Sequence, residues 1–179
     1  MKKLADLDVK GKTVVIRQDL NVPMKEGKIT NDKRIRAALP TVKLALEKGA
    51  GVILLSHLGR PTEGVFEEQF SMKPIAEKLS QELGIPVKCA RELEDCKVAP
   101  GSCVLLENIR FFKGEKKNDP EFAGKLNFYV NAVNEFIRRE SDNPTIGLLI
   151  CRDMDRTEVQ LAFQGITTPM GVATYDNIK

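Results

Sequence analysis

TVVIRQDLNVP (13–23), GVILLSHLGRP (51–61) and CVLLENIRF (103–111) are three stretches in which a short apolar run ends in a polar cluster. Each run is rich in Val, Ile and Leu, which is typical of a strand buried on both faces of a parallel sheet. Helical patterns separate the runs along the chain, as expected for βαβ units. The sequence therefore predicts an α/β fold built on a parallel sheet.

Two helices are expected between these strands. The first begins after Asn31 or Asp32, bends at Pro40 and ends near residue 48, and the second begins at Ser71 and ends near residue 83. Further along the chain, the pattern predicts a short strand at 85–89, a helix over 119–140, a strand over 145–151, a helix over 156–164 and a strand over 170–175.

Composition excludes several classes of protein. The chain has 179 residues, 42% of them hydrophobic, and a net charge of +3, so one domain or slightly more is expected and nothing calls for nucleic acid or a membrane. It has no apolar run long enough to span a bilayer and no signal-peptide pattern at its start. The four cysteines show no C-x-x-C spacing, which favours reduced thiols and a cytoplasmic location. A single histidine leaves few metal partners, so no metal site is expected.

The candidate binding residues follow the strands. In open α/β sheets, ligands bind at the carboxyl ends of the strands. Arginines there suit a carboxylate or phosphate, and the neighbouring carboxylate and amide groups suit hydroxyls. The residues expected at the carboxyl ends of these strands are Arg17, Asp19, Asn21, His57, Arg60 and Arg110. Two plainer interpretations stay open, namely that Arg17 and Asp19 only pair at a strand end and that the lone His57 is structural.

Arg34 adds a second indication of an anion. It lies in the first turn of the first expected helix, where the helix dipole disfavours a positive charge. A phosphate received jointly by Arg34 and the helix N-terminus would explain that placement.

The same residues carry a resemblance to a known family. VVIRQDLNVP, SHLGRP, LLENIRF and GEKKNDPEFAGKL, together with the helical segments between them, resemble the N-terminal domain of phosphoglycerate kinase over about residues 1–126. The resemblance implies a Rossmann-like three-layer parallel sheet that binds 3-phosphoglycerate.

Roles for single residues follow from the resemblance. It implies that Asp19 and Asn21 contact the glycerate, while His57, Arg60 and Arg110 hold its phosphate end. Arg34 is implied as the catalytic residue, stabilising the charge of the phosphoryl group in transfer. In the family, Mg-ATP or Mg-ADP is bound by a second domain, and no residues for either are expected in this chain.

Three departures from the family pattern bear on activity. Phe112 replaces a frequent histidine, and NFYVNAVNEFIRRESDNPT stands where the family has a segment of the form NDAFGTAHRAH. The nucleotide-binding half has no counterpart here, and neither G-x-x-x-x-G-K-[ST] nor G-x-G-x-x-G occurs. We therefore expect the chain to be inactive alone, with the missing nucleotide-binding half as a partner.

The tail resembles a different family. Residues from about 122 to 179 are similar to the C-terminal end of DUF1016-type PD-(D/E)xK nuclease-like proteins. Glu115 and Lys117 form an E-x-K by letter, but KGEKKND reads as a solvated loop rather than a buried catalytic strand. The two resemblances meet at PEFAGKL, so the chain looks like a chimera joined near 121–126.

The expected organisation is a phosphoglycerate kinase-like domain over 1–126 and a nuclease-family-like βαβ extension over 127–179, which either completes the same sheet or forms a separate piece. Four functions stay open at this point. They are a kinase that needs a nucleotide half from another chain, a non-catalytic phosphoglycerate-binding module, a nuclease acting through the tail, and a non-functional product of recombination.

Overall fold

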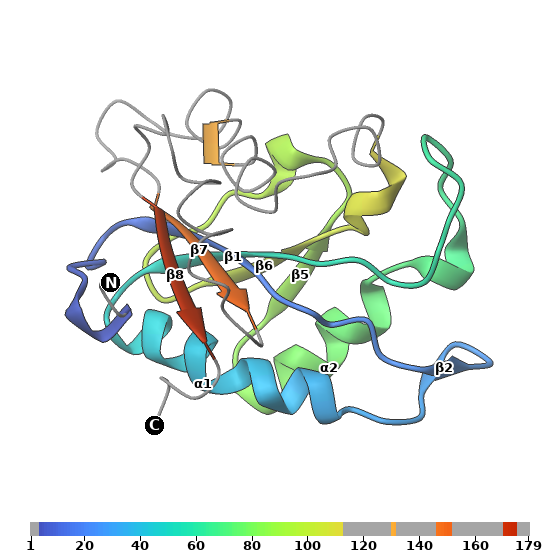
Figure 1. Cartoon of the computed structure of the whole chain (residues 1–179), viewed down its shortest axis with the longest axis horizontal. Coiled ribbons are helices and arrows are strands. Elements are labelled where there is room, and N and C mark those ends of the chain that lie inside the picture. The colour runs from blue at the N-terminus through green and yellow to red at the C-terminus, as the bar shows by residue number, and fades with distance from the viewer. Residues whose placement is uncertain (1–3, 113–129, 132–145, 152–169, 175–179) are drawn as a thin grey trace.

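The computed structural model describes residues 4–112, 130–131, 146–151 and 170–174 (Figure 1). The helix expected over 119–140 lies outside these residues except at 130 and 131, which are helical. The helix expected over 156–164 and the pair Glu115 and Lys117 lie wholly outside them.

A six-stranded sheet forms the centre of the molecule, in the order β5-β6-β4-β1-β7-β8. Every pairing within it is parallel, as the apolar runs predict. Its strands are β1 (Thr13–Arg17), β4 (Gly51–Leu55), β5 (Val87–Ala90), β6 (Cys103–Leu106), β7 (Ile146–Cys151) and β8 (Met170–Thr174).

The tail strands β7 and β8 belong to this same sheet (Figure 1). β1 pairs with β4 on one side, where Arg17 lies opposite Leu55, and with β7 on the other, where Val14 lies opposite Ile146. The strands expected at 145–151 and 170–175 are thereby confirmed. Because all six strands run in parallel, their carboxyl ends lie at one edge of the sheet.

Two helices connect the N-terminal strands. α1 (Lys33–Glu47) runs through Pro40 without a break, and α2 (Lys73–Leu83) ends at Gly84, whose left-handed φ of 69° completes its C-cap. The residue before α2 is Met72, so the expectation that Ser71 caps the helix is wrong by one position. The Ser71 hydroxyl still accepts a hydrogen bond from the Lys73 N–H, at 3.2 Å.

The remaining described elements are short. Strands β2 (Met24–Lys25) and β3 (Lys28–Ile29) form an antiparallel hairpin. The 3₁₀ helices are η1 (Leu4–Asp6), η2 (Glu68–Phe70), η3 (Leu93–Asp95) and η4 (Ile109–Phe111).

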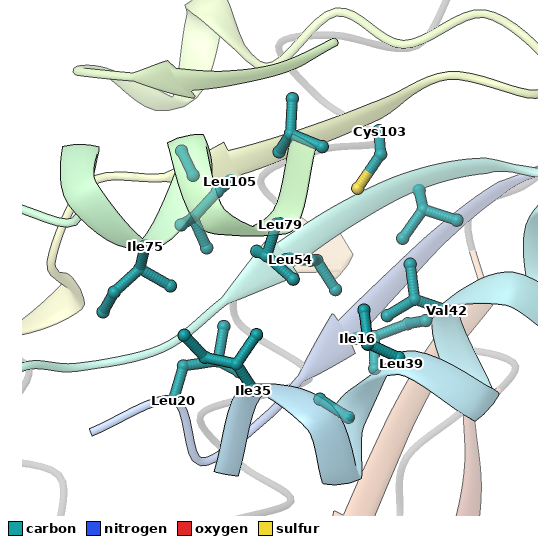
Figure 2. Packing of buried hydrophobic residues seen from close by; sticks show 14 of the residues in the cluster. Ile16, Leu20, Ile35, Leu39, Val42, Leu54, Ile75, Leu79, Cys103 and Leu105 are labelled. Atoms are coloured by element: carbon teal, nitrogen blue, oxygen red, sulfur yellow. The ribbon is translucent and has the colours of Figure 1, made fainter. Parts of the chain in front are cut away.

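The core lies on both faces of the sheet, since successive strand residues point to opposite sides. On one face, Ile16, Leu54 and Leu105 pack with residues of α1 and α2, and Figure 2 shows this cluster from close by. On the other face, Ile53 and Val130 belong to a second buried cluster. β4 is buried along its whole length, which fixes the position of the loop that follows it.

None of the helices in the described ranges has the length and the hydropathy needed to cross a bilayer.

Candidate functional site

The polar segments that follow β1, β4 and β6 lie next to one another at the carboxyl edge of the sheet. β4 pairs with both β1 and β6, so their ends are adjacent. We call these segments the strand-end rim, consisting of residues 17–21, 56–60 and 107–110. Five of the six residues predicted to bind substrate lie on this rim, and the sixth, Arg34, lies in the first turn of α1.

Asp19 and Arg34 form an ion pair on the rim. Nη1 of Arg34 donates to both carboxylate oxygens of Asp19, at 2.8 and 2.6 Å. Each side chain keeps 51% of its surface exposed. The pair accounts for an arginine at the start of α1, because the Asp19 carboxylate offsets the unfavourable dipole there. Asp19 thus has Arg34 as a partner in the structure.

Gly59 joins the segment after β1 to the segment after β6. Its N–H donates to Oδ1 of Asn21 at 3.0 Å, and its carbonyl accepts a hydrogen bond from Nη1 of Arg110 at 2.6 Å. The φ of Gly59 is +59°, and a Cβ at this position would overlap the ring of Phe70. Only glycine allows the backbone to pass between these groups in this conformation.

The ion pair and the Gly59 contacts are parts of one chain of hydrogen bonds. The Asn21 N–H donates to Oδ1 of Asp19 at 3.2 Å, and this links the two. The chain therefore runs from Arg34 through Asp19, Asn21 and Gly59 to Arg110. Four of the six predicted residues are thus brought together.

His57 and Arg60 flank Leu58 and Gly59 in the sequence, and Gly59 belongs to this chain of hydrogen bonds. His57 is half-buried directly after Ser56, and Arg60 is exposed directly after Gly59. With Arg17, Arg34 and Arg110, Arg60 gives the site four guanidinium groups against the two carboxylates of Asp19 and Glu107. The excess of positive charge suits an anionic ligand.

Three buried polar residues of the rim were not predicted as part of the site. Glu107 and Asn108 are 5% and 0% exposed, and Ser56 is fully buried. Oγ of Ser56 accepts from the Leu20 N–H at 2.9 Å, which ties the end of β1 to the end of β4. The sequence signal was the E-N pair directly after an apolar run, since polar residues at such a position need internal partners when they are buried.

Thiol and metal chemistry find little support in the described residues. Burial raises the pKa of Cys89, Cys96 and Cys103 to about 12, so each stays a neutral thiol at physiological pH. In the described ranges no three His, Cys, Asp or Glu side chains come together in a way that would hold a metal ion. The guanidinium groups of the rim are suited to anion binding and charge stabilisation.

Comparison with protein families divides the chain into two overlapping parts. Residues 4–135 match the family model of phosphoglycerate kinase, and residues 110–179 match that of the YhcG PDDEXK nuclease domain. The two matches overlap across the segment in which the sequence resemblances also meet.

Individual relatives agree with the first match. Phosphoglycerate kinase of Desulfovibrio desulfuricans is 69% identical over 124 residues, covering 69% of this chain and 32% of the relative. The enzyme of Haemophilus ducreyi is 58% identical over 127 residues, covering 70% of this chain and 32% of the relative. The chain thus matches only about a third of the length of these relatives.

Solved structures show the same likeness in three dimensions. Phosphoglycerate kinase from Coxiella burnetii superposes with a TM-score of 0.73 at 37% identity, over 96% of this chain and 41% of that one. The Pyrococcus horikoshii enzyme superposes with a TM-score of 0.72 at 30% identity, over 97% of this chain and 42% of that one.

Proposed function

The chain belongs to the phosphoglycerate kinase family, and from this membership we propose that it is the 3-phosphoglycerate-binding half of a phosphotransferase. In that reaction a phosphoryl group passes between 1,3-bisphosphoglycerate and ADP. These 179 residues bind the ligand, and phosphate transfer requires them to act together with a nucleotide-binding half.

The observation that carries this proposal is the hydrogen-bonded chain from Arg34 to Arg110. It holds acceptors at Asp19 and Asn21 and guanidinium groups at its two ends. 3-Phosphoglycerate presents a C2 hydroxyl that suits the first kind of partner, and a phosphate and a carboxylate that suit the second. Acceptors and guanidinium groups along one rim therefore support a ligand that carries both a hydroxyl and a phosphate.

Each residue has a distinct part in the proposed complex. Asp19 and Asn21 contact the glycerate, and His57, Arg60 and Arg110 hold the phosphate end. Arg34 is half-exposed and held by a single carboxylate, so it is free to swing from Asp19 to a more highly charged phosphoryl group. Its guanidinium would then stabilise the negative charge that develops during transfer.

The family also implies Mg-ATP or Mg-ADP. In the described ranges no three His, Cys, Asp or Glu side chains come together to hold a metal ion. We assign the nucleotide to a separate nucleotide-binding half.

Calorimetric titration with 3-phosphoglycerate tests the proposal. Wild type should release or absorb heat on binding, and Arg34→Ala and Arg60→Ala should each weaken binding about tenfold or more, because each removes a charge-assisted contact worth about 1.5–3 kcal/mol. Arg36→Ala is the matched control, since Arg36 lies on the same helix and pairs with Asp32 instead. Absence of binding by wild type would contradict the proposal.

Complementation then separates a half-enzyme from a binding module. The chain mixed with a separately produced C-terminal half of a phosphoglycerate kinase should form ATP from ADP and 1,3-bisphosphoglycerate. If ligand binding is present but the mixture makes no ATP, the chain is a non-catalytic phosphoglycerate-binding module.

The match of residues 110–179 to a nuclease domain favours one other candidate. A nuclease acting through the tail requires metal-dependent cleavage of DNA that is lost in Lys117→Ala. If no cleavage is seen with Mg²⁺ or Mn²⁺, the tail is a remnant of that family without its activity.

A further inference from the structure

One residue of the strand-end rim carries a fully buried amide. Asn108 follows β6, and its side chain has no exposed surface. Its own N–H is held by Oε1 of Glu107 at 2.8 Å. A buried amide is retained without a large cost only when its polar atoms are bonded.

The side chain of Asn108 bonds to three separate segments. Nδ2 donates to the carbonyl of Leu58 at 2.7 Å and to the carbonyl of Phe70 at 3.0 Å. Oδ1 accepts from the Arg110 N–H at 3.2 Å. One residue thus ties the loop after β4, the loop before α2 and the start of η4 to a common point.

These three segments carry the phosphate end of the proposed site. Leu58 precedes Gly59, whose carbonyl accepts from Arg110, and Phe70 carries the ring that lies against Gly59. Asn108 therefore fixes both partners of the contact between Arg110 and Gly59. It also fixes the backbone from which Arg60 projects.

We propose that Asn108 is a positioning residue for the phosphate end of the ligand, acting through Arg110 and the loop at Gly59. This inference rests on the proposed function, because it takes 3-phosphoglycerate as the ligand. Asn108 has no exposed surface and does not itself contact the ligand. It sets the position of Arg110 relative to the loop that carries Arg60.

The test uses Asn108→Ser in the full chain. A serine hydroxyl keeps an acceptor for the Arg110 N–H but is too short to donate to Leu58 and Phe70 together. Affinity for 3-phosphoglycerate, measured calorimetrically and corrected for the folded fraction, should fall about tenfold. Leu79→Ala, in the core on α2, is the control for lost stability alone and should leave the corrected affinity within twofold of wild type.

A double-mutant cycle with Arg110→Ala separates positioning from a merely structural role. If Asn108 acts through Arg110, then Asn108→Ser should weaken binding by less than about twofold once Arg110 is absent. An equal loss in both backgrounds, or no loss in the single variant, overturns the inference while leaving the proposed function intact. A wild type that binds no 3-phosphoglycerate overturns both.

A measurement on wild type keeps the inference testable if Asn108→Ser does not fold. The side-chain amide signal of Asn108, assigned by nitrogen-15 NMR, should shift during titration with 3-phosphoglycerate, following the same binding curve as the Arg110 amide. An Asn108 signal that stays in place while the Arg110 signal moves overturns the inference.

Discussion

Gln18 is a buried residue whose side chain is left without partners. It is 3% exposed, and in the described part of the chain neither Oε1 nor Nε2 has a hydrogen-bond partner. It lies between β1 and the first acceptor of the candidate site. An unsatisfied buried amide reduces stability by about 1–3 kcal/mol.

Replacing Gln18 with methionine should therefore raise the stability of the protein. Methionine has a similar length and carries no amide to desolvate, so we expect a gain of about 1 kcal/mol in the free energy of unfolding. Urea denaturation measures it. Gln81→Met, at an exposed position on α2, should change stability by less than about 0.5 kcal/mol. A Gln18→Met protein no more stable than wild type would show that the amide is satisfied in solution.

The buried thiols predict loss of stability in alkali. Burial raises the pKa of Cys96 and of Cys103 from 9.0 to about 12. The unfolded chain loses these protons above pH 9 while the folded protein keeps them, so stability is complete below pH 9 and declines between pH 9 and 12.

At pH 10 each buried thiol should account for about 1 kcal/mol of that loss. The decline in unfolding free energy from pH 8 to pH 10 should therefore be smaller in Cys103→Ala than in wild type by about this amount. Equal declines in the two proteins would contradict the assignment.

At the scale of elements, the N-terminus of α2 is held by a carboxylate from another part of the chain. Oε1 of Glu107 accepts from the Met72 N–H at 2.6 Å, and Oε2 accepts from the Ser71 hydroxyl at 2.8 Å. Since the first N–H groups of a helix have no partners within it, this carboxylate acts as the cap.

Glu107→Gln should weaken α2 and with it the whole domain. The amide keeps the shape of the side chain but places an N–H₂ group against other donors, at a cost of about 1–3 kcal/mol. Chemical denaturation measures the change. Glu77→Gln, exposed on the same helix, is the control and should be nearly neutral. A neutral Glu107→Gln would show that the cap contributes little.

Local sequence was sufficient for the strands of the sheet and for α1 and α2, but not for the cap of α2. The apolar runs predicted β1, β4 and β6, and α2 ends at Leu83, as expected, with the αL residue Gly84 after it. Ser71 was misplaced as the cap because the group that bonds Met72 comes from 35 residues further along the chain.

Part of the candidate site could likewise be predicted from local sequence, and part could not. Residues that follow a strand could be predicted to share an edge, because parallel strands place them there. The contribution of Asn108 could not, because its partners Leu58 and Phe70 are 50 and 38 residues away and are backbone carbonyls without a sequence signal. The structure also shows Arg34 bonded to Asp19, a contact that depends on where α1 packs.

At the scale of the whole molecule, β7 protects the side of β1 that faces away from β4. β1 is buried over Val14, Val15 and Ile16 and bonds to a neighbour on each side. Without β7 it becomes an edge strand with an open row of backbone groups, and such apolar edges aggregate.

A chain that ends after residue 112 should therefore be recovered mainly as aggregate. A chain that ends after residue 174 retains both tail strands and should stay monodisperse by size-exclusion chromatography. Equal behaviour of the two chains would show that the N-terminal strands are stable without the tail.

Val14 in β1 pairs with Ile146 in β7, which is synthesised much later. The order of synthesis therefore determines when β1 gains this neighbour. At translation rates of about 5–20 residues per second, β1 leaves the ribosome on the order of ten seconds before its partner β7. During that interval the N-terminal elements can assemble, namely β1, β4, α1 and α2. The side of β1 that later pairs with β7 stays unpaired until β7 is made. A nascent chain with such a delay is a natural client for holdase chaperones, and slower translation between residues 17 and 146 would lengthen its exposure.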